Sequence, residues 1–329
     1  MSVDLPNPYG HSRLRRNASF RRTTSVDVIW PEGRYGKLQL IGVGRDIFTH
    51  NTTQPIEVLA FNGLRVTVTA DKYIEAIACE PDVGAISSLR GLPCVGGFRR
   101  GYQSLVGQGV PTQSPLVLLL DDVIGATVVS DWAWSVYPNL ISAAEKQERK
   151  GRLEGMAGVC AGFRAGSSAL AADGDFQYTR CAIVPSLPHP SDPDGWHPVK
   201  NHADVSLRRS RCMDVWLENH NIIIESIFQD SAVRPDGRRV AVHEYSLRAE
   251  VSLEGYVLQG LTITPHILPY PECPSALSFA YGMIGKSLPE FNTSVLTMLR
   301  REKGCTHLND ALRALSDLPE IFSNLPFQV

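Results

Sequence analysis

A cysteine, a histidine and an aspartate lie within six consecutive positions near the C-terminus, in the segment GCTHLND. Leu308, Leu312 and Leu315 follow at helical spacing, so the segment predicts a helix with Thr306 as its N-cap and His307 in its first turn. The positive end of a helix dipole favours the neutral form of an imidazole. Because a neutral imidazole near physiological pH can accept a proton, this position suits a general base.

A second histidine lies next to an acidic residue in the segment VHEYSLR, which has the composition of a β-strand. We interpret His243, Glu244 and His307 as the candidate catalytic group. The two histidines would move protons, and Glu244 would orient or polarise the reacting groups. Arg248 could hold an anionic group or support the fold. The candidate substrate-binding residues are Arg248 and four aromatic residues that could wall an apolar pocket: Trp132, Trp134, Tyr137 and Trp196.

The same part of the sequence also offers metal ligands. The acceptable ligand types for an alternative zinc or iron site are those of His243, Glu244, His307 and Cys305. An adjacent His-Glu pair lacks the HExxH spacing that places two ligands on one face of a helix. Cys305 could instead be a nucleophile activated at the helix start, although a free cysteine is more often simply buried. We therefore expect no cofactor, with Zn or Fe as the alternative.

Four segments of the N-terminal part of the chain recur in the C-terminal part in the same order, beginning at Ser19 and at Ser206. The matched pairs are SFRRTTSVDVIW with SLRRSRCMDVWL, GRDIF with FQDSA, LRVTVTADKYI with LRAEVSLEGYV, and LLDDVIGA with HLNDALRA. The offset between the copies drifts by only a few residues, as changes in loop length would produce. Four matches in one order predict an internal duplication.

The two copies act as an internal control on the candidate residues. Residues that are polar in one copy and apolar in the other cannot be required by the shared fold. By this test the functional candidates are His243, Glu244 and His307, which align with Ala60, Phe61 and Leu119. Residues retained in both copies are more simply structural: Arg65 with Arg248, and Asp122 with Asp310. We therefore assign structural support to Arg65, Asp122 and Asp310, and expect one site, in the second copy.

In each copy, segments with the composition of β-strands come first and segments with helical periodicity follow, which predicts an α+β fold. We expect two related repeats, each an antiparallel sheet with helices, packed about a pseudo-twofold axis with a helical and loop insert between them. The predicted division is a flexible N-terminal arm (1–18), a degenerate first repeat (19–129), an insert (130–205) that could be a lid or a site wall, and a second repeat (206–329) that carries the site.

Composition and motifs exclude several classes of protein. The 329 residues carry a formal net charge of −2, so no overall field favours nucleic acid or an anionic membrane. The seven cysteines form no close CxxC pair, which argues against a disulfide framework and favours a reducing cytoplasm. No stretch reaches the ~18 apolar residues of a membrane span. The chain also lacks the GxGxxG, GxxxxGK[ST] and GxSxG motifs, which disfavours dinucleotide, P-loop and α/β-hydrolase chemistry.

Three motifs carry a resemblance to a known family. At VHEYSLR, YPECP and GCTHL (242–248, 270–274 and 304–308), the chain resembles the bacterial domain-of-unknown-function family numbered 2889, over about residues 206–318. Where that family reads His-Asp-Met, this chain has His243-Glu244-Tyr245, so the acid remains and the next residue differs. The resemblance implies a domain and not a reaction, so the chemistry is argued from the residues.

These observations favour a cofactor-independent acid–base enzyme that acts on a small-molecule substrate. A lyase for a small aromatic or hydrophobic compound, working by elimination or retro-aldol-type C–C cleavage, needs only proton transfer. One alternative is a metal-dependent hydrolase that uses the His/Glu/Cys cluster. The other is a non-catalytic ligand-binding or assembly protein, in which the histidines are structural. We expect a cytoplasmic protein that binds neither nucleic acid nor membrane, with a homodimer possible.

Overall fold

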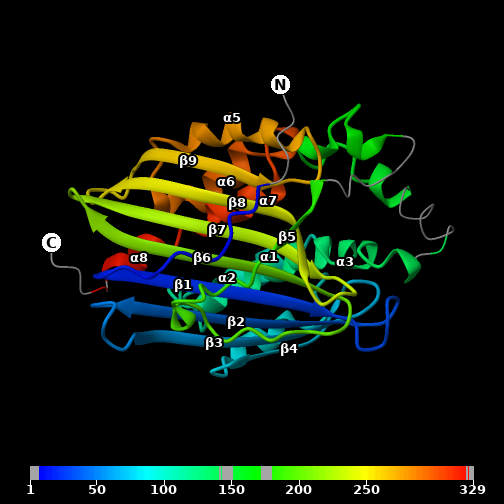
Figure 1. Cartoon of the computed structure of the whole chain (residues 1–329), viewed down its shortest axis with the longest axis horizontal. Helices are drawn as coiled ribbons and strands as arrows, with labels where there is room; N and C mark the ends of the chain where they lie inside the picture. Colours follow the sequence, from blue (N-terminus) through cyan, green and yellow to red (C-terminus); the bar gives the residue numbers. More distant parts are fainter. Residues whose placement is uncertain (1–6, 141, 143–150, 172–179, 324, 326–329) are drawn as a thin grey trace.

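The computed structural model describes residues 7–140, 142, 151–171, 180–323 and 325. In that part of the chain, nine strands form one antiparallel sheet in the order β4-β3-β2-β1-β6-β7-β8, and β5 and β9 both pair with β8 (Figure 1). This large sheet with its several helices confirms the expected mixture of α and β structure. The strands are β1 (Ser19–Ile29), β2 (Leu38–Thr49), β3 (Glu57–Val68), β4 (Ile74–Glu80), β5 (Ala182–Val184), β6 (Ser206–Glu218), β7 (Asn221–Val233), β8 (Arg239–Ser252) and β9 (Leu258–Ile267).

The central strands β1 and β6 join two parts of the sheet, which we name the first half (β1–β4) and the second half (β6–β9). Their register sets Arg21 opposite Asp214 and Asp27 opposite Arg208. Arg21 donates to the Asp214 carboxylate at 2.6 and 3.0 Å, and Arg208 donates to Asp27 at 2.6 and 2.8 Å. Because breaking a buried ion pair is costly, these two reciprocal pairs fix the register between the halves.

Helices cover one face of the sheet. The longest, α2, starts at Pro115 after Ser114, whose side-chain oxygen accepts a hydrogen bond from the Leu116 N–H, and both features favour a helix start. α2 packs on β1, β2 and β3 of the first half. None of the described helices is long and apolar enough to cross a membrane. The helices are α1 (Phe98–Gln103), α2 (Pro115–Val129), α3 (Trp132–Ser135), α5 (Leu277–Ala280), α6 (Phe291–Met298), α7 (Thr306–Arg313) and α8 (Leu318–Ser323).

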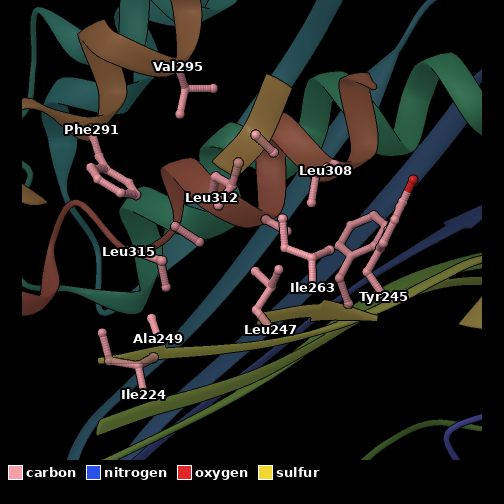
Figure 2. Packing of buried hydrophobic residues seen from close by; sticks show 14 of the residues in the cluster. Ile224, Tyr245, Leu247, Ala249, Ile263, Phe291, Val295, Leu308, Leu312 and Leu315 are labelled. Carbon is pink, nitrogen blue, oxygen red and sulfur yellow. The ribbon is translucent and has the colours of Figure 1, made fainter. Parts of the chain in front are cut away.

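The core of the second half lies between its strands and the helices α6 and α7. Figure 2 shows Leu308, Leu312 and Leu315 directed toward the apolar side chains of β7, β8 and β9, among them Leu247 and Ile263. All five side chains are buried. Full burial of a leucine or isoleucine stabilises a fold by about 1.5–3 kcal/mol, so this face of α7 holds the helix firmly on the sheet. The leucine spacing in the sequence is therefore the reason that α7 lies where it does.

The N-terminal arm and a loop of the insert (185–205) cross part of the other face of the sheet. Residues 7–18 of the expected flexible arm run across the strands of the second half before entering β1 (Figure 1), while residues 1–6 lie outside the described part. Arg15 donates to Asp192 from both its main chain, at 3.0 Å, and its side chain, at 2.8 Å. His197 of the same loop contacts Ser25 and Thr23 of β1 at 2.8 and 2.9 Å. These contacts tie the arm and the loop to the sheet.

In its described residues, the insert between the halves (130–205) consists mainly of loops and short helical turns, and residues 151–154 are helical. It contains α3, β5 and the short 3₁₀ turns Ala161–Phe163 and Ser168–Leu170, whereas residues 141, 143–150 and 172–179 lie outside the described part of the chain. One backbone hydrogen bond of 2.9 Å, from the Ala161 N–H to the Gly304 carbonyl, attaches the insert to the loop before α7. The insert is thereby held beside the start of that helix.

Candidate active site

Three side chains from different elements converge on the helical face of the second half: Asp230 of β7, His243 of β8 and His307 of α7. His243 Nδ1 lies 3.2 Å from Asp230 Oδ2, and His307 Nε2 lies 3.5 Å from the same oxygen. The two imidazole rings are stacked, with centroids 3.5 Å apart and an interplanar angle of 20°. The structure therefore brings together the two histidines that the sequence singled out and adds a carboxylate to them.

Strand pairing and helix packing explain this convergence. Asp230 and His243 are directly opposite each other in the β7–β8 ladder, and a bulge follows immediately after Asp230. α7 begins at Thr306, one residue earlier than an N-cap at Thr306 would place it, so His307 is its second residue. Cys305, rather than the expected Thr306, takes the N-cap position, and no side chain caps the helix there. The His307 ring also contacts Phe228 of β7, with centroids 6.1 Å apart.

Asp230 is fully buried, and an arginine of the central strand neutralises it. Arg209 of β6 donates to both Asp230 oxygens, at 2.9 and 3.0 Å, and also to Asp310 of α7 at 2.9 Å. Burial alone would raise the pKa of Asp230, but the Arg209 charge and the contact with His243 lower it below its ordinary value. Asp230 is therefore a permanent carboxylate beneath the histidines.

Both histidines are held in the neutral state. Burial lowers the pKa of His243 below its ordinary value, although Asp230 opposes this shift. Burial together with the neighbouring His243 lowers the pKa of His307 further. The Asp230 carboxylate, 3.2 Å from Nδ1, favours the tautomer of His243 with its proton on that nitrogen. Nε2 of His243 then has a free lone pair that can accept a proton.

The histidines form one wall of a cavity of about 280 Å³. The cavity is lined mainly by apolar and aromatic side chains, among them Trp132 and Phe163 of the insert and Tyr270 of the loop after β9. A mostly apolar cavity with a few polar groups at one end is typical of small-molecule sites. Residues of the insert therefore form part of this wall.

The Asp230, His243 and His307 ligand atoms lie within 4.8 Å of one another, so their chemistry suits a transition metal. The ring geometry is less favourable. Nitrogen lone pairs lie in the ring plane, so an ion in the plane of one of two stacked rings lies well out of the plane of the other. Both oxygens of Asp230 are also occupied by Arg209. A shared metal therefore requires at least one imidazole to rotate.

The charges around the site are already balanced. The connected network of ion pairs contains four arginines and four aspartates: Arg99, Arg209, Arg211 and Arg313, with Asp121, Asp122, Asp230 and Asp310. A divalent ion would add two positive charges without a further described counter-ion in this network. Uncompensated charge in a buried site is costly, so the network favours neutral histidines without a metal.

The structure separates Glu244 and Arg248 from the histidines. Successive residues of a strand face opposite sides of the sheet, so Glu244 points away from His243. Glu244 accepts hydrogen bonds from the Gln229 side chain at 2.7 Å and from the Tyr9 N–H at 2.8 Å, on the face that carries the N-terminal arm. Arg248 lies on that same face and donates to Glu225 at 2.6 Å. Neither residue can touch a molecule in the cavity.

Of the four aromatic candidates, only Trp132 lines the cavity. Trp134 is buried against Trp30 in the core of the first half, with ring centroids 5.4 Å apart. Tyr137 is half-buried and lies outside the lining. Trp196 is buried in the loop that covers the opposite face of the sheet. The position of an aromatic residue in the insert alone did not identify which one would reach the site.

The three predicted support residues differ in their surroundings. Asp122 is buried and accepts two hydrogen bonds from Arg211, at 2.6 and 2.8 Å. Asp310 is buried and accepts from Arg209. Arg65 is exposed on β3 and makes no ion pair with any described residue. The aspartates therefore hold α2 and α7 to the sheet, whereas Arg65 does not pair with them.

Cys305 lies close to the histidines but is not prepared for nucleophilic attack. Its Sγ accepts a hydrogen bond from the Tyr245 hydroxyl at 3.4 Å and lies 3.9 Å from His307 Nδ1. Burial raises the pKa of Cys305 above its ordinary value, so the thiol stays protonated. Cys305 also lies outside the group of converging ligand atoms.

Sequence reasoning did not identify Asp230 or Arg209 as site residues. The internal control could not select them, because Asp230 aligns with Asp46 and Arg209 with Arg22, so neither residue differs in polarity between the copies. A signal was present nevertheless. Asp230 follows the largely apolar segment IIIESIFQ, where a carboxylate needs a buried partner.

Comparison with known proteins gives one match. No curated protein and no solved structure matches the chain. Residues 207–319 match the family model described as "Protein of unknown function (DUF2889)", in agreement with the resemblance seen in the sequence. This segment of the second half, which contains Asp230, His243 and His307, is therefore similar to that family of proteins of unknown function.

Proposed function

We propose that this protein is a cofactor-independent acid–base enzyme, and that it acts as a lyase on a small aromatic or hydrophobic substrate. The observation that carries the proposal is the position of two neutral histidines above a buried carboxylate, at the wall of an apolar cavity of about 280 Å³. Perturbed titratable groups that meet in one cavity are a common property of active sites.

Each residue of the site has a distinct role in this proposal. Nε2 of His243 accepts the substrate proton, because Asp230 holds the ring and stabilises the imidazolium that forms. His307, stacked on His243, provides the second position for proton transfer. Arg209 does not touch the substrate; it keeps Asp230 ionised and in place. The aromatic wall around Trp132 holds the apolar part of the substrate.

A retro-aldol cleavage illustrates the chemistry without any oxidant or reductant. His243 removes the proton of a β-hydroxyl group, the C–O bond becomes a carbonyl, and the C–C bond breaks. The electron pair passes to the carbon next to an activating carbonyl of the substrate, and that carbon is then protonated. An elimination uses the same two proton positions, because a base removes a C–H proton while an acid protonates the leaving group.

We also propose that the two halves arose by duplication and are related by a pseudo-twofold axis. The β1–β6 register supports this, because it places Thr24 opposite Arg211, two residues that align between the copies. A bulge follows Asp46 in β2 as it follows Asp230 in β7. The reciprocal ion pairs of the central strands also exchange with each other under such an axis.

A screen of aromatic β-hydroxy carbonyl compounds, aromatic diols and aromatic acids tests the enzymatic proposal. We expect His243→Ala and His307→Ala to lower the rate of cleavage by about 10²–10⁴-fold while the far-ultraviolet circular dichroism stays unchanged. Asn221→Ala is the control. Asn221 is the first residue of β7, at the end of the strand far from Asp230, so this variant should keep full activity. Binding of compounds without turnover, equal in the wild type and both variants, would support a non-catalytic binding protein instead.

The convergence of three ligand atoms favours a second candidate, a metal-dependent hydrolase that uses Asp230, His243 and His307. Elemental analysis of the purified protein, repeated after incubation with zinc or ferrous salts, separates the two candidates. One equivalent of metal that is lost in both histidine variants would replace the lyase with the hydrolase. Activity that survives exhaustive chelation, with no stoichiometric metal, supports acid–base chemistry alone.

A further inference from the structure

A second hollow adjoins the apolar cavity at the start of α7. It has a volume of about 200 Å³ and lies between α6, the turn Arg301–Lys303 and α7. Val159 and Thr306 line both spaces, so they form the rim that the two hollows share. A ligand whose apolar part lies in the cavity beside His307 can therefore extend over this rim into the second hollow.

The second hollow is lined by two arginines and by no acidic residue. Arg300 and Arg301 are exposed, and neither makes an ion pair within the described part of the chain. The two exposed guanidinium groups therefore make this hollow positively charged, at the rim that it shares with the cavity of the candidate site.

The backbone holds the two arginines at the edge of the hollow. The Asn309 side chain of α7 donates to the Leu299 carbonyl at 2.8 Å, which fixes the end of the α6 segment to α7. Gly304 is required here, because a Cβ at this position would come within 2.2 Å of the Leu299 carbonyl oxygen. Arg301 has φ +52°, a left-handed conformation that turns the chain sharply between the two helices.

We propose that the substrate is an amphiphilic anion: an aromatic or otherwise apolar body in the cavity, joined to a carboxylate or phosphate group bound by Arg300 and Arg301. Guanidinium groups match the geometry of both kinds of anion and bind them through paired hydrogen bonds. The positive entrance also raises the local concentration of such molecules. This inference rests on the proposed function only for the identity of the site, and the binding that it predicts does not require turnover.

Titration calorimetry with three probes tests the inference: 2-naphthoate, 2-naphthyl phosphate, and the neutral analogue 2-naphthalenemethanol. We expect both anions to bind the wild-type protein about tenfold more tightly than the neutral analogue at low salt, and to lose most of that advantage at 0.5 M salt. A preference for only one anion identifies the head group.

Substitutions test whether Arg300 and Arg301 cause the preference for the anionic probes. Arg300→Ala and Arg301→Ala should each weaken anion binding about fivefold and leave the binding of the neutral probe unchanged. Arg90→Ala is the matched control, because it removes the same charge from an exposed arginine of the first half that lines neither hollow. It should have no effect on any probe.

The inference is overturned if the neutral and anionic probes bind equally, if no probe binds, or if Arg90→Ala has the same effect as the other two variants. Its failure is distinct from failure of the proposed function. Turnover of neutral compounds that is lost in His243→Ala would retain the lyase and exclude the anionic substrate. Anion binding by a wild-type protein that turns over none of the screened compounds would retain the anion site and argue against the lyase.

Discussion

The two halves of the sheet contain nearly the same buried ion pair but only one of them has histidines above it. In the first half Arg22 donates to the two oxygens of Asp46 at 2.7 and 2.6 Å. In the second half Arg209 makes the corresponding pair with Asp230 at 2.9 and 3.0 Å. All four side chains are buried. The ion pair is therefore part of the way this sheet is built, and on its own it does not mark a site.

The difference lies in the residues around the carboxylate. Ala60 is opposite Asp46 in the β2–β3 ladder, where His243 is opposite Asp230 in the β7–β8 ladder. Leu119 of α2 is buried in the core of the first half, whereas the aligned residue His307 lines a cavity. Apolar side chains therefore fill the space above Asp46 in the first half, whereas the corresponding space in the second half is part of a cavity. In the second half the buried ion pair also supports two histidines.

The largest expected effect on the free energy of unfolding comes from removing the carboxylates of Asp46 and Asp230, one at a time. Asp46→Ala leaves Arg22 buried with only a distant carboxylate, that of Asp317 at 3.9 Å, so we expect a loss of about 3–5 kcal/mol in the free energy of unfolding. Asp230→Ala leaves Arg209 paired with Asp310 at 2.9 Å, so a smaller loss of about 2–3 kcal/mol follows. Urea unfolding followed by circular dichroism measures both.

Asp46→Asn and Asp230→Asn keep the shape of the side chains and serve if the alanine variants do not fold. Equal losses, or a larger loss for Asp230, would contradict the view that the second-half carboxylate belongs to a wider charge network. Only the Asp230 variants should also lower activity, because the residue opposite Asp46 is Ala60 and not a histidine.

The next largest effect is on the pH dependence of the free energy of unfolding, which His243 and His307 should give to the second half only. Burial lowers the pKa of His243 and of His307, so both are neutral in the folded protein while the unfolded chain binds protons below about pH 6.5. Stability is therefore complete above that pH and falls as the pH drops from about 6.5 toward the lowered pKa values. The double variant His243→Ala, His307→Leu, which copies the first half, should lose this dependence.

Between pH 7 and pH 5 the wild-type protein should lose about 2 kcal/mol more of its free energy of unfolding than the double variant. The remaining buried histidine of the opposite face, His197, is present in both proteins and cancels in the comparison. Identical pH profiles for the two proteins would mean that His243 and His307 are accessible to protons in the folded state.

Part of the architecture was predictable from the sequence. The strand-like and helical segments predicted an antiparallel sheet with helices, and the spacing of Leu308, Leu312 and Leu315 predicted α7 with its start one residue late, because these patterns depend on local geometry alone. The pairing of β1 with β6 was not predictable from these segments. Pairing between distant strands depends on side chains such as Arg21 and Asp214, which meet only in the folded sheet.

The candidate site was predicted in part. His243 and His307 were found because they are polar in one half and apolar in the other. Asp230 was missed because a residue kept in both halves can be structural and functional at once. Glu244 was placed beside His243 because it is adjacent in sequence, but the two-residue period of a strand directs it to the opposite face. That period was readable from the sequence and could have excluded it.

A smaller effect on the free energy of unfolding is expected when Glu244 is replaced. Its aligned residue in the first half, Phe61, is 45% exposed, whereas Glu244 is fully buried and binds Gln229 and the Tyr9 N–H. Glu244→Ala leaves both donors without their acceptor, which costs about 1 kcal/mol and loosens the arm of residues 7–18. Hydrogen exchange should show faster exchange of the Tyr9 and Ser12 amides, with activity retained. Loss of activity without loosening of the arm would return Glu244 to the site.

The smallest effect is expected for the two arginines that both halves retain. Arg248 is 48% exposed at its side chain and pairs with Glu225, and Arg65 is exposed without a described ion pair. Exposed pairs contribute little, so Arg248→Ala and Arg65→Ala should each change the free energy of unfolding by less than about 1 kcal/mol and leave turnover unchanged. Retention in both halves would then reflect exposed strand positions that tolerate a long charged side chain, and not a shared site. A strong loss of activity in Arg248→Ala alone would show that the face carrying the N-terminal arm also binds substrate, and the comparison of the halves would have to include both faces of the sheet.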